Sequence, residues 1–235
     1  MTSIKRIISI THPQKQYRRL LITQHIKRPY TLQTQGSTTN IIIPARVQKN
    51  KMTLTAHYDV YQGSKGYNDN SSGVVALLNI HDLVPDNVEI VFTDFEEFGG
   101  IGCELYLNLS KIKPKQAINV DVVGLGNKLF YESYVGGISS KIPESLEYYK
   151  NVPFSDSYIF RNFNIPNILL LSGTKKETLI SDIFNAQHNG PHDGDLSYIS
   201  NEMIDFTSKT ILNLVENQER KDVYKNENTE WFCFK

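Results

Sequence analysis

The sequence predicts an α/β protein, a three-layer sandwich whose central sheet is mixed but mostly parallel. Short apolar runs rich in β-branched residues alternate along the chain with runs of helical patterning. Strands that alternate with helices are typical of parallel sheets covered on both faces. The chain has 235 residues, a length that fits one large α/β domain, and no repeat or low-complexity linker divides it. We therefore expect a single domain over residues 1–235.

The first part of the chain is expected to supply two helices and three strands. The strands are short β-branched runs, and the loop between them is rich in Gly, Asn and Asp. Ser71 or Ser72 stands where the N-cap of the second helix is expected. In chain order the expected elements are a helix at 13–27, strands at 38–45 and 51–57, a loop at 58–70, a helix at 71–83 and a strand at 88–94.

The second part continues the alternation after the loop FEEFGG. Ser155 or Asp156 is expected to cap a helix, and Gly173 is expected to end a strand. The expected elements are a helix at 101–109, strands at 117–124 and 128–133, a helix at 155–163, a strand at 165–173, and helices near 175–185 and 201–218.

Charge and composition argue against several classes of partner. The 25 basic and 25 acidic residues give a formal net charge of zero, so nothing favours a nucleic acid or an anionic membrane. The basic run from Lys15 to Arg19, with Lys27 and Arg28, is interpreted as the solvent side of an N-terminal helix. No run has the apolar length of a signal peptide or a membrane span.

The two cysteines, Cys103 and Cys233, lie far apart and do not make a disulfide framework. A reducing compartment is therefore favoured, and we expect a cytoplasmic protein. No motif indicates an oligomeric state or a role for the tail Trp231–Lys235.

Residues with distinctive chemistry stand where the expected strands end. His57 ends one strand, Glu96 and Glu97 follow another, and Asp121 lies near the end of a third. In open α/β sheets, ligands bind at the carboxyl ends of the strands. These residues are far apart in the sequence, and the fold is expected to bring them to one edge of the sheet.

The residue types suit a metal site. The neutral imidazole of His57 is a good zinc ligand, and Asp59, two residues on, can accept its second N–H. Asp69 stands at a loop-to-helix junction, where its two oxygens could bridge two cations. Taken alone, Asp69 would be interpreted as a turn residue, and it is the whole set in order along the chain that predicts a metal site.

The other acidic residues strengthen this interpretation. The like charges of Glu96 and Glu97 raise each other's pKa. A division of labour resolves this conflict: one glutamate binds metal and the other transfers protons. Asp121 lies inside an apolar run, where a lone carboxylate is costly unless it is paired or bound to metal.

Four segments of the chain can be compared with a known family: TAHYDVYQGSKGYNDNSSGVVALL, VFTDFEEFGGIGC, INVDVVG and PFSDSYIFRNFNIP. Together they resemble the dizinc aminopeptidase family of metallopeptidase clan MH, over about residues 40–199. The motifs are specific in combination rather than singly. The resemblance implies a zinc-exopeptidase fold and two divalent metal ions, for which zinc suits the mixture of histidine and carboxylates.

The resemblance also implies a role for each matching residue. It makes Asp69 the bridge between the two ions, pairs His57 with Asp121 on one of them, and gives Glu97 to the other. The implied set comprises the metal ligands His57, Asp69, Glu97 and Asp121, the catalytic residues Glu96 (general base) and Asp59, and Asp156 on the substrate side or in the outer shell.

The last metal ligand has two candidates in the segment AQHNGPHDGDLSYIS. Pro191-His192-Asp193 resembles the Pro-x-Asp that follows the ligand histidine in the family, which makes His188 the ligand after a one-residue insertion. The alternative is His192, with Asp195 as the following aspartate. We prefer His188 because a metal motif needs its flanking context.

The implied activity is hydrolysis of the N-terminal peptide bond of a peptide with a free N-terminus. A water that bridges the two ions attacks, and a glutamate takes its proton. Two alternatives of other classes stay open. One is a glutaminyl cyclase-like acyltransferase with a single zinc, and the other is a non-catalytic binding domain of the same fold. A deacylase or carboxypeptidase of the same clan is a further alternative, although these usually carry an inserted lid domain.

Overall fold

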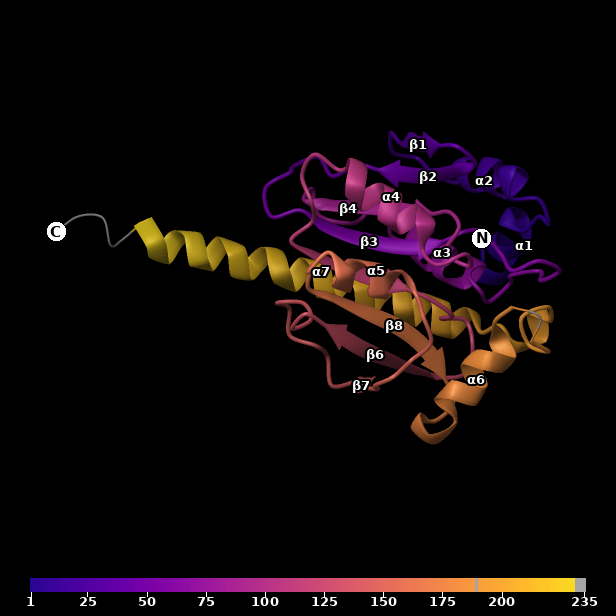
Figure 1. The fold of residues 1–235 in the computed structure, drawn as a ribbon. Helices are drawn as coiled ribbons and strands as arrows, with labels where there is room; N and C mark the ends of the chain where they lie inside the picture. Colours follow the sequence, from indigo (N-terminus) through magenta and orange to yellow (C-terminus); the bar gives the residue numbers. More distant parts are fainter. Residues whose placement is uncertain (189, 231–235) are drawn as a thin grey trace.

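One mixed sheet runs through the computed structural model, which describes residues 1–188 and 190–230 (Figure 1). Its strands are β1 (Thr31–Gln35), β2 (Thr38–Ile43), β3 (Met52–His57), β4 (Val88–Thr93), β5 (Gln116–Val120), β6 (Lys128–Tyr134), β7 (Leu146–Tyr148) and β8 (Asn167–Gly173). They lie in the order β1-β2-β4-β3-β5-β8-β6-β7. The central strands β4, β3, β5 and β8 are parallel, while β2 and β6 join them antiparallel. The expected mixed sheet with a parallel centre is confirmed.

Helices cover both faces of this sheet. They are α1 (Ser3–Ile10), α2 (Lys15–Thr23), α3 (Ser71–Leu78), α4 (Ile101–Leu109), α5 (Asp156–Asn162), α6 (Leu179–Ala186) and α7 (Asn201–Glu230), with short 3-10 turns η1 (Lys176–Thr178) and η2 (Leu196–Tyr198). Helices α1, α3 and α7 share one apolar core, while α4, α5 and α6 cover the other face. Strand β8 shows this division between the two faces. Ile168 and Leu170 pack on the side of α1, α3 and α7, whereas Leu169 and Leu171 pack on the side of α6.

Helix α3 lies deepest in the first core. Its eight residues, SSGVVALL, are all buried, so the helix has no face exposed to solvent. Its N-cap is Asn70 rather than Ser71 or Ser72, because the Asn70 side-chain oxygen accepts the backbone N–H of Gly73 at 3.0 Å. The helix ends at Leu78, before the expected end at 83, and turns follow it.

The N-terminal region differs most from expectation. The helix expected at 13–27 is confined to α2, and α1 precedes it. The solvent-exposed interpretation of the basic run is wrong for Arg18 and Arg28, which are 1% and 9% exposed. Both are buried because backbone carbonyls accept their guanidinium hydrogens, at Lys65 for Arg18 and Pro44 for Arg28.

Three smaller differences concern the edges of the fold. Strands β1 and β7 were not expected, and β5 ends at Val120, before the expected end at 124. Helix α7 continues to Glu230 and extends beyond the sheet in Figure 1. Cys233 and the tail lie outside the described residues. Within the described part of the chain, no helix has both the length and the apolar character needed to cross a membrane.

Candidate metal centre

The predicted site residues gather at the carboxyl ends of the parallel strands. His57 is the last residue of β3, Glu96 and Glu97 follow β4, and Asp121 follows β5. Asp69 comes from the other end of the loop after β3, immediately before α3. The register of neighbouring strands pairs His57 with Thr93, which places these chain segments at the same height along the sheet.

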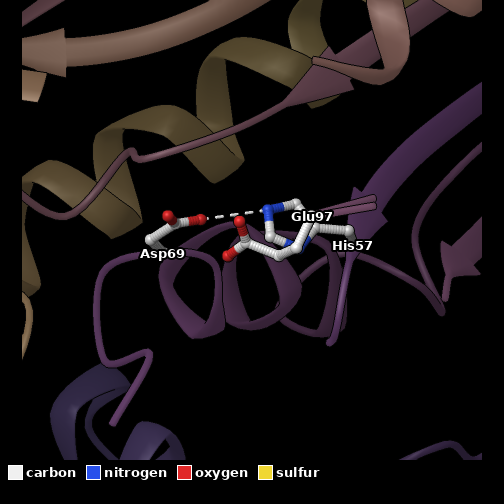
Figure 2. A group of neighbouring side chains, drawn as sticks. All are labelled: His57, Asp69 and Glu97. Atoms are coloured by element: carbon white, nitrogen blue, oxygen red, sulfur yellow. Dashed lines mark ion pairs between the residues drawn. The ribbon is translucent and has the colours of Figure 1, made fainter. Parts of the chain in front are cut away.

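Three of these side chains converge on one point (Figure 2). Ligand atoms of His57, Asp69 and Glu97 all lie within 4.8 Å of one another. The His57 Nε2 atom is 3.0 Å from Asp69 Oδ1 and 3.4 Å from Asp121 Oδ1. Glu96 Oε2 is farther from this nitrogen, at 3.9 Å. The geometry separates Glu96 from the converging group, although it is adjacent to Glu97 in sequence.

Asp59 sits behind the group and holds two parts of it. Its carboxylate accepts the backbone N–H groups of Glu96 at 3.1 Å and Glu97 at 3.2 Å. His57 Nδ1 is 3.2 Å from the backbone oxygen of Asp59 and 3.4 Å from its Oδ1. The aspartate therefore fixes the glutamate loop with its side chain and contacts the histidine ring mainly through its backbone.

The last histidine of the group is His188. Its Nε2 is 3.0 Å from Glu97 Oε2, and its backbone N–H donates to Asp69 Oδ2 at 3.2 Å. His192 instead stacks on Tyr198 with ring centroids 3.8 Å apart. The structure thus brings His188 to the acidic cluster and gives the ring of His192 a different partner.

Asp156 lies beneath the cluster as the first residue of α5. It is 1% exposed, and its Oδ2 accepts the Thr93 hydroxyl at 2.6 Å, while Oδ1 has no hydrogen-bond partner. Burial raises the pKa of this carboxyl to about 7, with the charge of Asp121 acting in the same direction. Asp156 is thus a buried acid that faces the acidic cluster.

The sequence did not reveal the part played by Asp193. This carboxylate is fully buried. Its Oδ1 accepts the backbone N–H groups of Asn68 and Asp69. Its Oδ2 accepts the backbone N–H of Gly66 and the hydroxyl of Ser64. It joins the loop of His188 to the loop of Asp69. The Pro-x-Asp pattern marked the position of Asp193, but an aspartate in a Gly-rich run looks like a turn residue, and bonds to a loop so distant in sequence could not be predicted.

The crowding of carboxylates has an electrostatic consequence. Burial, reinforced by the neighbouring charge of Asp69, raises the pKa of Glu97 to about 8. Burial also raises the pKa of Glu96 and of Asp121. Burial opposes a charged His57, but Asp121 and Glu96 outweigh that effect, and the pKa of His57 is raised. Groups held this close together are stabilised in their ionised forms by a cation among them.

Two buried atoms show that a metal ion fits this arrangement. His57 Nε2 and Asp121 Oδ1 are both inaccessible to solvent and form no hydrogen bond of acceptable geometry. Buried polar atoms are normally paired, and an imidazole nitrogen that faces carboxylate oxygens is a typical zinc donor set. The residues present therefore suit a divalent cation.

The cluster borders a small cavity of about 30 Å³. The acidic residues form one wall, and Phe154, Leu169, Leu171 and Ile183 contribute apolar side chains to another. Charged groups beside apolar side chains are the kind of lining that ligand-binding sites use.

The fold and this site define a class of α/β metallohydrolase-like proteins. The chain belongs to that class as a member of peptidase family M28, whose model matches residues 40–215.

Three known proteins are similar to this chain. Aminopeptidase YwaD of Bacillus subtilis (strain 168) is 32% identical over an alignment of 124 residues that covers 48% of this chain and 27% of the relative. The structure of BSAP, a zinc aminopeptidase from Bacillus subtilis, matches with a TM-score of 0.61 and 25% identity, over 75% of this chain and 49% of that one. A glutaminyl cyclase of Porphyromonas gingivalis matches with a TM-score of 0.70 and 18% identity, over 92% of this chain and 95% of that one. This last likeness concerns the fold alone, and the chain spans half or less of the matched aminopeptidases.

Proposed function

We propose that this chain is a co-catalytic metallo-aminopeptidase that hydrolyses the first peptide bond of peptides with a free N-terminus. The observation that carries the proposal is the convergence of His57, Asp69 and Glu97, whose ligand atoms lie within 4.8 Å of one another. The family and its zinc aminopeptidase relatives support the choice of reaction.

The side chains divide into two donor sets that share Asp69. His57 and Asp121 lie on one side, and Glu97 and His188 on the other. The Oδ1 atom of Asp69 faces His57, while Oδ2 faces the backbone of His188. This arrangement supports two sites with a bridging carboxylate. Two divalent ions held there, zinc by ligand type, would supply Lewis acidity and lower the pKa of the attacking water.

Glu96 is the proposed general base. It is 7% exposed and stays outside the tightest group, so its carboxylate is free to take a proton from the water. Asp59 fixes its backbone, which limits the positions that the side chain can reach. After the attack Glu96 returns the proton to the leaving amine, as a general acid. Asp156, close to Glu96 and inaccessible to solvent, is proposed to act from the outer shell or the substrate side.

The substrate and the setting belong to the same proposal. The carboxylates of the cavity suit the ammonium group of a free N-terminus, and its apolar wall suits an uncharged first side chain. No nucleic acid or membrane is proposed as a partner. A cytoplasmic location is proposed only because the chain has just two cysteines, far apart in sequence. Fractionation of cells that express the native gene tests it.

The decisive experiment combines a metal count with a substrate comparison. Protein purified with zinc is expected to hold two ions per chain by elemental analysis and to cleave aminoacyl p-nitroanilides. The same substrates with an acetylated N-terminus are expected to be inert, and a chelator should abolish the cleavage until zinc is restored. A single ion per chain, with release of ammonia from peptides that begin with glutamine, would overturn the proposal in favour of a glutaminyl cyclase. No turnover of either substrate class by zinc-loaded protein would favour a binding domain.

A further inference from the structure

Arg18 lies in helix α2, before the segment that the family model matches. Only 1% of its surface is exposed, although its neighbours Tyr17 and Leu20 on the same helix are open to solvent. A fully buried arginine is unusual, because burial of a charge is costly unless the charge is satisfied. The groups around Arg18 must therefore compensate the cost of burying its charge.

The guanidinium group of Arg18 spans one short segment of the loop before α3. Its Nη1 donates to the Ser71 hydroxyl at 2.7 Å, and its Nη2 donates to the backbone carbonyl of Lys65 at 2.7 Å. A weaker contact joins Nε to the carbonyl of His12 at 3.4 Å. The two strong contacts lie at the two ends of residues 65–71, the segment that carries Asp69.

The same segment is packed closely against the guanidinium. Gly66 adopts a φ of +62°, and a Cβ atom there would lie 3.0 Å from Arg18 Nη2 and 2.8 Å from the carbonyl oxygen of Asp69. On the other side, Asp193 accepts the backbone N–H groups of residues 66, 68 and 69. The segment is thus held between a buried cation and a buried anion.

The acceptors of Arg18 are all neutral, yet its charge is oriented toward the acidic centre. No carboxylate oxygen of the described residues lies within ion-pair distance of it, and its charge is attracted by Asp193, Asp59 and Asp69. An apolar side chain would fill the same space without the cost of a buried charge. The buried guanidinium therefore points to a task at the acidic loop rather than to packing alone.

We propose that Arg18 is a positioning residue for the metal centre: its two N–H donors fix residues 65–71 so that both oxygens of Asp69 face the two donor sets. The inference rests on the proposed function, because Asp69 is taken as the bridging ligand. It assigns to α2, which the family match leaves out, a part in the assembly of the site.

The test compares Arg18→Met with Arg18→Lys and with the control Lys5→Met, which removes a positive charge from an exposed position on α1. Zinc is titrated into each protein after chelation, and kcat and KM are measured with an aminoacyl p-nitroanilide. Loss of an outer-shell partner typically costs about 10–100-fold in metal affinity, and we expect this loss in Arg18→Met. Because Arg18 does not touch the cavity, kcat should fall while KM stays near the wild-type value.

Arg18→Lys should recover only part of the loss, since an ammonium lacks the fork that reaches both acceptors. Lys5→Met should match the wild type.

Wild-type zinc affinity and kcat in folded Arg18→Met would overturn the inference, as would full recovery by Arg18→Lys. If Arg18→Met does not fold, Ser71→Ala replaces it: this variant removes one acceptor and keeps the Lys65 contact. It should weaken zinc binding in the same direction by a smaller factor, and unchanged zinc binding in Ser71→Ala would overturn the inference. Failure of the proposed function is visible separately in the wild type, as zinc binding without peptide cleavage. In that case the zinc titrations still decide the role of Arg18.

Discussion

Glu96 and Glu97 are adjacent carboxylates that occupy different environments. The backbone before them turns at Phe95, which adopts a φ of +56°, and both amide groups are held by Asp59. Glu97 then faces His188 and also accepts the backbone N–H of Tyr61 at 3.0 Å, whereas Glu96 faces the side of His57. The two side chains are fixed on different sides of the cluster, as a division between base and ligand requires.

Substitution of each glutamate by glutamine should separate these roles. Glu96→Gln is expected to keep both metal ions and to lose most of its turnover, since a positioned base contributes about 10²–10⁴-fold. Glu97→Gln should instead weaken zinc binding, because one oxygen that faces His188 is replaced by an amide. Zinc titration and kcat check both, with Glu104→Gln on the exposed side of α4 as the control. The assignment is reversed if Glu96→Gln loses metal and Glu97→Gln keeps it.

The two late histidines give a second prediction for single residues. His188→Ala should severely weaken one of the two zinc sites, because its Nε2 is the neutral donor that faces Glu97. His192→Ala should bind both ions, since its ring stacks on Tyr198 away from Glu97. Calorimetric titration of zinc into each variant measures the two sites separately. An empty site in His192→Ala together with normal binding in His188→Ala contradicts this prediction and restores the shortened-loop alignment.

At the scale of elements, the parallel strands and the residues at their ends were predictable from the sequence. β-branched apolar runs such as VEIVFT and AINV have few other interpretations, and the end of a parallel strand fixes which edge a residue reaches. The edges were not predictable. β1 reads TLQTQ, has no apolar alternation and is held mainly by its pairing with β2, while β7 has only three residues. Arg18 also escaped prediction, because its burial depends on a carbonyl 47 positions away along the chain.

The turn after α3 is joined to the segment before β1 by His81. Its Nε2 accepts the backbone N–H of Lys27 at 3.0 Å, while Nδ1 contacts the carbonyl of Leu78 at 2.8 Å. This pattern suits the neutral ring with the proton on Nδ1, although an Asp82 oxygen also lies 3.0 Å from Nε2. Burial lowers the pKa of His81 below its usual value near 6.5, which favours the neutral ring that accepts the Lys27 N–H.

The lowered pKa of His81 predicts a dependence of stability on pH. Between pH 6.5 and the lower pKa of the folded state, the unfolded chain binds more protons than the folded protein. The free energy of unfolding therefore rises with pH in this range. The contribution of His81 is therefore complete above about pH 6.5 and is lost as the pH falls toward the folded-state pKa. Urea unfolding of wild type and His81→Gln from pH 7.5 to 5 should show a weaker pH dependence in the variant. Parallel curves for the two proteins would show that His81 does not carry this effect.

At the scale of the whole molecule, the candidate site is assembled from four separate parts of the chain. Its residues follow β3, β4 and β5 and come from the loop after α6, so they meet only when the sheet is complete. The assembly brings buried carboxylates together, and burial raises the pKa of Glu96, Glu97 and Asp121. Folding therefore builds a place where a cation is favoured, and metal binding should be linked to the stability of the entire fold.

Removal of metal should accordingly lower the unfolding temperature of the whole chain in one cooperative step. A ligand that binds only the folded state stabilises it by about 2.7 kcal/mol per site when its free concentration is 100 times Kd. For a chain of this length, about 2–4 °C per kcal/mol gives a shift of about 5–10 °C for each site. Calorimetry of zinc-loaded and chelated protein measures the shift, and Glu97→Gln should retain only part of it because one donor set is damaged. Magnesium at the same concentration serves as the control, since a set with histidine suits zinc better. Equal unfolding temperatures with and without zinc would mean that the acidic cluster does not hold the ion. Zinc that binds the folded protein must raise its unfolding temperature, whichever reaction the protein catalyses.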